Sequence, residues 1–193
     1  LQLPLVESID ELTPEWAWGG ATGKGVRVAV VDSGIDATHP DLEGCVDTEG
    51  SAQVELDDER KPHIVVGPHE DSFGHGTACA SVAAGSGAAS GGRYRGVAPG
   101  ASLFVVHNEG LLDVHVIEGI REAFEVAGDR PCVVNLSLGT HFGAHDGTSP
   151  LENEIANLSG PGRIVVCAGG NDGSLGSHAV ADCSTGPVCI GFR

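Results

Sequence analysis

The chain has 193 residues, and its 27 acidic side chains against 10 basic ones give a formal net charge of −17. This charge argues against nucleic acid and anionic membrane surfaces as partners, and no apolar stretch approaches the roughly 20 residues that span a bilayer. The 30 glycines and 4% aromatic residues favour a tightly turned α/β fold filled with small aliphatic side chains. The length suits one domain or the larger part of one.

The first half of the chain centres on the apolar stretch at 28–31, which lies within a predicted strand at 26–31 and runs into Asp32. Residues 1–25 predict an irregular lead-in with a short helical turn near Pro14. The stretch itself predicts a strand buried on both faces. Asp32 would stand at the carboxyl end of that strand, where ligands and chemistry gather in parallel sheets. Taken alone, it fits equally well a turn aspartate that bonds its own backbone.

A run of small residues, 75–85, predicts a helix that packs closely against a sheet, with His75 in its first turn. Before it, residues 43–62 are acidic and show no periodicity, which predicts an exposed loop. Residues 64–66 predict a short strand.

The second half of the chain alternates apolar stretches with segments of helical periodicity. This alternation predicts βαβ units and a parallel sheet. The expected strands are 102–106, 132–136 and 164–168, the expected helices are 112–126 and 150–158, and one or two further short strands are expected within 178–192.

The six cysteines include no Cys-x-x-Cys pair, which argues against a structural zinc site. Cys132 and Cys167 lie in apolar stretches, and we expect both to be buried thiols. Cys183 and Cys189 fit either a small disulfide-closed loop or two free thiols. The cysteines therefore fit an oxidising and a reducing compartment equally well.

Polar side chains follow three of the predicted strands, namely Asp32, Ser137 and Asn171, and His75 opens a helix beside the first of them. A carboxylate that accepts the Nδ1 proton of an imidazole fixes its tautomer and leaves Nε2 able to take a proton from a nucleophile. An asparagine amide at a neighbouring strand end can donate to a developing oxyanion. The pattern therefore indicates acid–base chemistry at one edge of the sheet.

Five segments in order, across residues 26–173, resemble the subtilisin-like serine peptidases, or subtilases, in which the aspartate motif precedes the histidine motif. Each segment alone is a weak signal, but five in order argue against a chance match. The segments are Val30-Val31-Asp32-Ser33-Gly34-Ile35 with His39-Pro40-Asp41-Leu42, Gly74-His75-Gly76-Thr77, Gly96-Val97-Ala98-Pro99, Asn135-Leu136-Ser137-Leu138-Gly139 and Ala168-Gly169-Gly170-Asn171.

The resemblance implies a three-layer α/β subtilisin-like fold, with a mostly parallel central sheet and helices on both faces. It also implies hydrolysis of peptide bonds through an acyl-enzyme. Asp32 would orient His75, His75 would act as general base and then general acid, and Asn171 would hold the oxyanion. Taken alone, His75 fits a packing residue and Asn171 a plain turn residue. Substrate-binding roles are implied for Ser137, Leu138, Gly139, Ala168, Gly169 and Gly170.

The family's serine motif, Gly-Thr-Ser-(Met/Leu)-Ala-x-Pro, has no match after Asn171. The triplet at 147–149 precedes Asn171, and Ser149 with Glu152 has the spacing of a helix capping box, with proline at the first helical position. We therefore expect Ser149 to be an N-cap. Residues 1–193 would form a single subtilisin-like domain, part of a longer chain and incomplete at the C-terminus, because it is truncated before the serine segment.

Two functions from different classes follow. The first is a serine endopeptidase acting on protein or peptide substrates, inactive as this chain alone, with the serine on a C-terminal segment or a second chain. The alternative is a non-catalytic pseudopeptidase that serves as a peptide-binding or regulatory module, with Asp32 and His75 as relics. A nucleotide-binding domain is disfavoured, because no Gly-x-Gly-x-x-Gly or P-loop follows the first strand.

The sequence assigns no metal site, cellular compartment or cleavage specificity. Many subtilases bind calcium, and Asp41 resembles a position used for it in some members. The glycine-serine loop after the His75 helix lacks the asparagine-containing ligand segment, so calcium stays open and no metal site is assigned. The resemblance slightly favours secretion, but it assigns neither compartment nor specificity.

Overall fold

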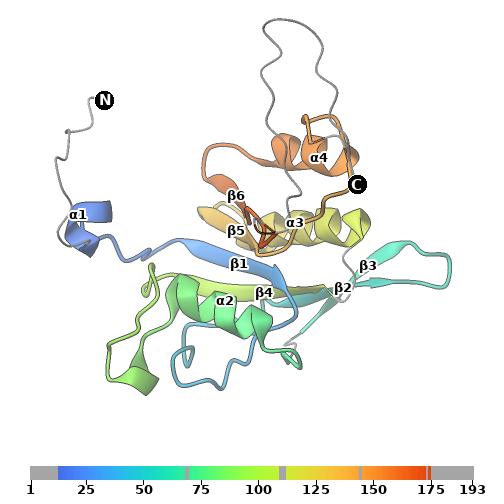
Figure 1. The fold of residues 1–193 in the computed structure, drawn as a ribbon. Helices are drawn as coiled ribbons and strands as arrows, with labels where there is room; N and C mark the ends of the chain where they lie inside the picture. The colour runs from blue at the N-terminus through green and yellow to red at the C-terminus, as the bar shows by residue number, and fades with distance from the viewer. Residues whose placement is uncertain (1–12, 68–69, 109–111, 144, 173, 175–193) are drawn as a thin grey trace, which may run out of the picture.

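The computed structural model describes residues 13–67, 70–108, 112–143, 145–172 and 174. In this part of the chain a six-stranded sheet has the order β3-β2-β4-β1-β5-β6, and every neighbouring pair is parallel except β2 with β3 (Figure 1). The strands are β1 (Arg27–Asp32), β2 (Ala52–Leu56), β3 (Pro62–Val66), β4 (Ser102–Asn108), β5 (Cys132–Leu136) and β6 (Arg163–Cys167).

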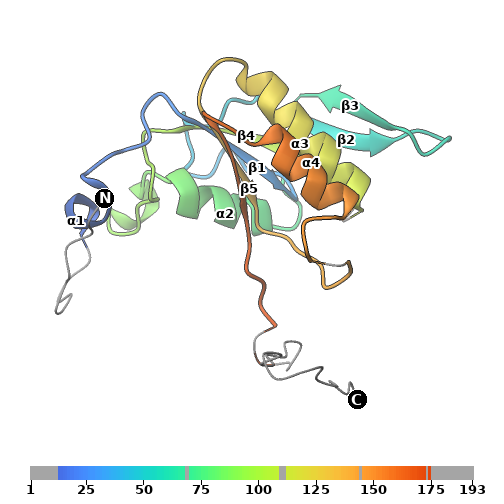
Figure 2. The same cartoon turned by 90° about the horizontal axis from the view of Figure 1, so that it is seen from above.

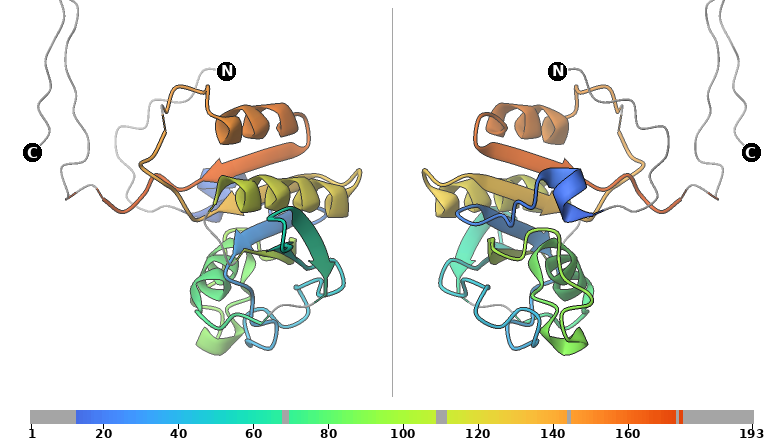
Figure 3. Two further views of the ribbon diagram at one scale, coloured as in Figure 1. Left: turned by 90° about the vertical axis from the view of Figure 1, so that its right-hand side faces the viewer. Right: turned by 90° about the vertical axis from the view of Figure 1, so that its left-hand side faces the viewer.

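Helices cover both faces of the sheet. Figures 2 and 3 show α2 on one face and α3 with α4 on the other. This arrangement confirms the predicted three-layer α/β fold. The helices are α1 (Pro14–Trp18), α2 (His75–Ala84), α3 (Asp113–Ala127) and α4 (Pro150–Leu158), with a 3₁₀ turn, η1, at Ala88–Ser90.

Strand β1 lies between β4 and β5 at the centre of the sheet and is buried along its whole length. Successive side chains of a strand point to opposite faces. Val28 and Val30 pack in a cluster that includes residues of α2, whereas Ala29 and Val31 pack in a cluster that includes residues of α3. By the same alternation, Asp32 falls on the α2 face.

The prediction of a loop over 43–62 is wrong in part, because this segment contains β2. Ala52 and Val54 are almost fully buried, while Gln53 and Glu55 between them are half-buried. The polar residues of this short strand therefore lie on its outward face, where acidic side chains keep their water. The strand's period-2 pattern is hidden by the acidic residues on either side of it.

Strand β6 lies at the edge of the described sheet and is mostly exposed, with Ile164 at 53% and Val166 at 48% exposure. The prediction that Cys167 is buried is therefore wrong, because its strand has only β5 as a hydrogen-bonded neighbour in the described part of the chain. The prediction for Cys132, on β5, is confirmed.

The remaining predicted helices and strands that fall on described residues agree with the structure to within two residues at each end. The strands expected within 178–192, and Cys183 with Cys189, lie outside the described residues. Where the structure describes the chain, no helix combines the length and apolar character needed to cross a bilayer.

Candidate active site

The structure brings together Asp32, the last residue of β1, and His75, the first residue of α2. The Nδ1 atom of His75 lies 2.7 Å from Oδ1 of Asp32. The Asp32 side chain is 5% exposed and that of His75 is 46% exposed, so a buried carboxylate holds an imidazole that solvent or a substrate can reach. When Nδ1 donates to the carboxylate, Nε2 of the neutral ring carries the lone pair and can accept a proton.

Close approach of α2 to the turn after β1 makes this contact. The helix begins at His75 behind Gly74, whose φ of 87° is left-handed and therefore suits glycine. A Cβ atom on Gly76 would stand 2.1 Å from the carbonyl oxygen of Gly34 and 3.2 Å from Cβ of Asp32. Only glycine therefore allows the first turn of α2 to lie this close to β1.

The two carboxylate oxygens of Asp32 have different environments. Oδ1 accepts the contact from His75 and a hydrogen bond of 2.8 Å from the backbone N–H of Ser33. Oδ2 is buried and has no hydrogen-bond partner among the described residues. Asp32 thus offers the imidazole an oxygen that is already fixed by the backbone.

Cys79 lies one helical turn after His75 on the same face of α2. Its Sγ atom is 3.9 Å from Nδ1 and 4.0 Å from Nε2 of the imidazole. Burial raises the pKa of the Cys79 thiol and the charge of Asp32 adds to this effect, while a hydrogen bond with Ser137 opposes it. The thiol is therefore protonated at neutral pH.

Donor atoms of Asp32, His75 and Cys79 all lie within 4.8 Å of one another. Carboxylate, imidazole and thiolate together suit a borderline or soft cation such as Zn²⁺ rather than calcium. Such a cation would have to displace the thiol proton and would occupy the imidazole. These three residues could therefore hold a metal only at the expense of the acid–base pair.

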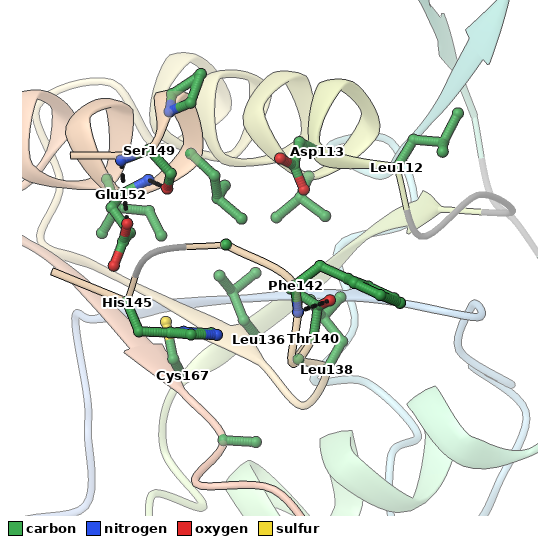
Figure 4. A pocket seen from close by; sticks show the side chains of 17 residues that line it. Leu112, Asp113, Leu136, Leu138, Thr140, Phe142, His145, Ser149, Glu152 and Cys167 are labelled. Atoms are coloured by element: carbon green, nitrogen blue, oxygen red, sulfur yellow. Dashed lines mark hydrogen bonds between the residues drawn. The ribbon is translucent and has the colours of Figure 1, made fainter. Parts of the chain in front are cut away.

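Three of the six predicted substrate-binding residues line an open cleft beside the sheet edge. The cleft has a volume of about 800 Å³, and Leu138, Gly139 and Ala168 line it. Figure 4 shows side chains of α3, α4 and the loop after β5 gathered around this space. The other apolar lining residues include Leu112, Val116, Leu136, Leu151 and Ile155. A cleft with such walls suits apolar side chains of a ligand.

The other predicted cleft residues do not line this space. Ser137 is half-buried and its hydroxyl accepts a hydrogen bond of 2.9 Å from the side-chain amide of Asn135. Gly169 and Gly170 are exposed in the loop after β6. The backbone of these segments still lies at neighbouring strand ends, because β5 and β6 pair in parallel.

Asn171 is exposed in the loop after β6, two strands from Asp32 in the sheet. The side chain of its neighbour Asp172 is in hydrogen-bond contact with Nε2 of His141, which lies in the loop after β5. This pair links the loops that follow two adjacent strands. Sequence reasoning missed it, since nothing in either loop indicates that the two side chains meet.

Ser149 is the N-cap of α4, as predicted. Its hydroxyl accepts a hydrogen bond of 3.2 Å from the backbone N–H of Glu152, and Oε2 of Glu152 accepts one of 3.1 Å from the backbone N–H of Ser149. Pro150 follows at the start of the helix. This serine is therefore engaged in a complete capping box.

The chain is similar to known proteases in both sequence and fold. Serine protease AprX of Bacillus subtilis is 38% identical over 164 residues, covering 79% of this chain and 34% of AprX. Subtilisin E of the same organism is 34% identical over 165 residues, covering 82% of this chain and 37% of its own length. The CspB protease of Clostridium perfringens has a TM-score of 0.64 at 26% identity, covering 82% of this chain and 39% of that one.

The curated relatives are longer than this chain, which spans between 34% and 52% of the length of those compared. The family model described as "Subtilase family" matches residues 23–187, which is most of the chain. This match includes the Asp32 and His75 segments that the structure brings together. The chain belongs to the subtilases, the family of subtilisin-like serine peptidases.

Proposed function

We propose that this chain is the amino-terminal part of the catalytic domain of a serine endopeptidase, and that it supplies Asp32, His75 and Asn171. The observation that carries the proposal is the 2.7 Å contact between Nδ1 of His75 and the buried carboxylate of Asp32. The contact stands at the carboxyl edge of a parallel sheet, where such chemistry gathers. The nucleophilic serine would come from a C-terminal segment or a second chain, so residues 1–193 alone are inactive.

In this mechanism Asp32 fixes the imidazole tautomer and stabilises the imidazolium form. Nε2 of His75 takes the proton of the serine hydroxyl as that oxygen attacks the scissile carbonyl carbon. The imidazolium then donates this proton to the leaving amine, which leaves an acyl-enzyme. A water molecule, deprotonated by the same imidazole, attacks the acyl carbon. The imidazolium then returns the proton to the serine oxygen as the second product leaves.

Asn171 would stabilise the tetrahedral intermediates through its side-chain amide. Removing one such donor costs roughly 10²–10³ in kcat in the subtilisin case that defines this effect. The proposed substrate is an extended protein or peptide that lies along Ser137, Leu138 and Gly139. Its apolar side chains would enter the cleft beside Leu138, and the backbone at 168–170 would lie along the other side of the peptide.

A fluorophosphonate probe followed by mass spectrometry tests the proposal. The isolated chain should carry no label and hydrolyse no peptide. The full-length protein should be labelled at one serine outside residues 1–193, and His75→Ala should abolish that labelling. Label on Ser149 would overturn both the proposed mechanism and the inactivity of the chain alone. A full-length protein that takes no label would favour the pseudopeptidase alternative.

A further inference from the structure

Asp71 lies four residues before His75, and its carboxylate accepts five hydrogen bonds from described residues. Oδ1 accepts from the hydroxyl of Ser33 at 2.9 Å and from the backbone N–H groups of Phe73 at 3.1 Å and Gly74 at 2.8 Å. Oδ2 accepts from the backbone N–H of Thr77 at 2.9 Å and from its hydroxyl at 2.6 Å. One carboxylate thus bonds both the turn after β1 and the first turn of α2.

Two hydroxyl groups extend the bonding of Asp71 to further backbone groups. The Ser33 oxygen, which donates to Asp71, accepts a hydrogen bond of 3.1 Å from the backbone N–H of Gly76. The Thr77 oxygen, which also donates to Asp71, accepts one of 2.9 Å from the backbone N–H of Asp36. Because each hydroxyl proton points to the carboxylate, the oxygen lone pairs are free to accept. Asp71 therefore orients both hydroxyls.

These hydrogen bonds hold the residues that are next to Asp32 and His75 in the chain. His75 lies between Gly74 and Gly76, and both of their backbone N–H groups are held by the network. Asp32 is followed directly by Ser33, which the network also holds. The helix begins without a side-chain cap at Gly74, so Asp71 takes over the role of satisfying N–H groups of the first turn.

We propose that Asp71 is a positioning residue for the Asp32–His75 pair. Its carboxylate holds the first turn of α2 against the turn after β1 and thereby fixes the 2.7 Å contact between the two side chains. The inference rests on the proposed function, since positioning matters for catalysis only if His75 is the general base.

The ionisation of Asp71 agrees with this geometry. Burial acts to raise the pKa of the carboxyl, but hydrogen bonds from Thr77, Gly74 and Ser33 outweigh it and lower the pKa to about 2. The group is therefore a carboxylate near neutral pH, with two oxygens that only accept. An asparagine in its place would present an NH₂ group, which cannot accept, to one of the two sets of donors.

The test compares Asp71→Asn with Asp57→Asn in the full-length protein. Asp57 is a matched control, because its Oδ1 accepts backbone N–H bonds from Glu59 at 2.9 Å and Lys61 at 2.8 Å in the β2–β3 turn, outside the site. One readout is kcat and KM for a chromogenic peptide. The other is the low-field proton resonance of the His75 Nδ1–H group, identified by its loss in His75→Ala.

Asp71→Asn should lower kcat by about 10- to 100-fold, leave KM within about twofold, and broaden or abolish the low-field resonance. Asp57→Asn should change neither readout. If the protein is no peptidase, the proposed function fails, yet the resonance still tests the positioning role of Asp71. The inference is overturned if Asp71→Asn keeps the resonance, and kcat where activity exists, at the level of Asp57→Asn.

Substitutions of Thr77 keep the inference testable if Asp71→Asn does not fold. Thr77→Val keeps the shape of the side chain but removes the hydroxyl that donates to Asp71 and accepts from Asp36. Thr77→Ser restores that hydroxyl. The valine variant should lose the resonance and kcat, and the serine variant should retain them. Equal behaviour of the two variants would contradict the inference.

Discussion

Replacing Gly76 by alanine tests whether the close packing of α2 on β1 sets the geometry of the site. The added Cβ would lie 2.1 Å from the carbonyl oxygen of Gly34, and real Cβ atoms essentially never approach closer than 3.0 Å. The position of the Cβ is fixed by the helix backbone and the oxygen belongs to the backbone of the turn, so the helix start and the turn must separate by about 0.9 Å, the difference between these distances. The same shift would lengthen the His75–Asp32 contact from 2.7 Å to about 3.6 Å, beyond hydrogen-bond reach.

We expect kcat/KM of the full-length Gly76→Ala protein to fall about 100-fold, which corresponds to about 2.7 kcal/mol in activation free energy. Overpacking should also lower the free energy of unfolding by about 1–3 kcal/mol. The assay is hydrolysis of a chromogenic peptide, performed at a temperature where circular dichroism shows the variant to be folded.

Gly119→Ala is the matched control, because Gly119 is a glycine of α3 that faces β1 from the other side. Its added Cβ would meet a methyl group of Val31 at 3.0 Å, and a side chain can yield where backbone cannot. This variant should keep kcat/KM within about twofold of the parent protein. If the folded Gly76→Ala protein behaves in the same way, the packing argument is refuted.

Further outcomes concern three other side chains. Ser149→Ala removes the hydroxyl that accepts the Glu152 N–H and should cost about 1 kcal/mol of stability in chemical denaturation without changing kcat; lost activity in the folded variant would contradict its role as a cap. Iodoacetamide should modify Cys79 slowly at neutral pH, because burial raises its thiol pKa, and modification should abolish activity by crowding His75; full activity after complete modification would be the contrary result. Because its pKa is lowered to about 2, the Asp71 carboxylate should contribute fully to the stability of the fold at pH values above the ordinary carboxyl pKa, near 4. This contribution should be lost as the pH falls toward 2. The free energy of unfolding of Asp71→Asn should therefore depend less on pH between those values than that of the parent protein. An unchanged pH dependence would contradict the hydrogen bonds of the Asp71 carboxylate.

The pairing of Asp32 with His75 could be predicted because both signals are local. An unbroken apolar stretch predicts β1, and the residue after it must stand at the strand end. A run of small residues that begins at His75 predicts a helix able to pack closely on a sheet. The resemblance to a known family then joined two segments that lie 43 residues apart.

The features of the site that the sequence did not predict depend on contacts between loops. Asp71 collects donors from a turn and a helix start, and no periodicity indicates this. The His141–Asp172 contact likewise joins two loops that only the sheet brings together. By contrast, Cys79 was within reach, because residues four apart on a helix share a face. Strand β2 was not within reach, because the acidic residues on either side of it hide the alternation of Ala52 and Val54 with polar neighbours.

The position of β1 also determines when the site can form. Arg27 pairs with Ser102 on one side and with Cys132 on the other, so the first strand of the sheet has only distant partners. Such non-local pairing is slow, because the chain must lose the entropy of closing a long loop before the paired strands gain any favourable contacts. During synthesis at about 5–20 residues per second, the ribosome takes roughly 5–20 s to pass from the first of these strands to the last. The acid–base pair would therefore be assembled late, and a growing chain would carry no competent site near its own unfolded segments.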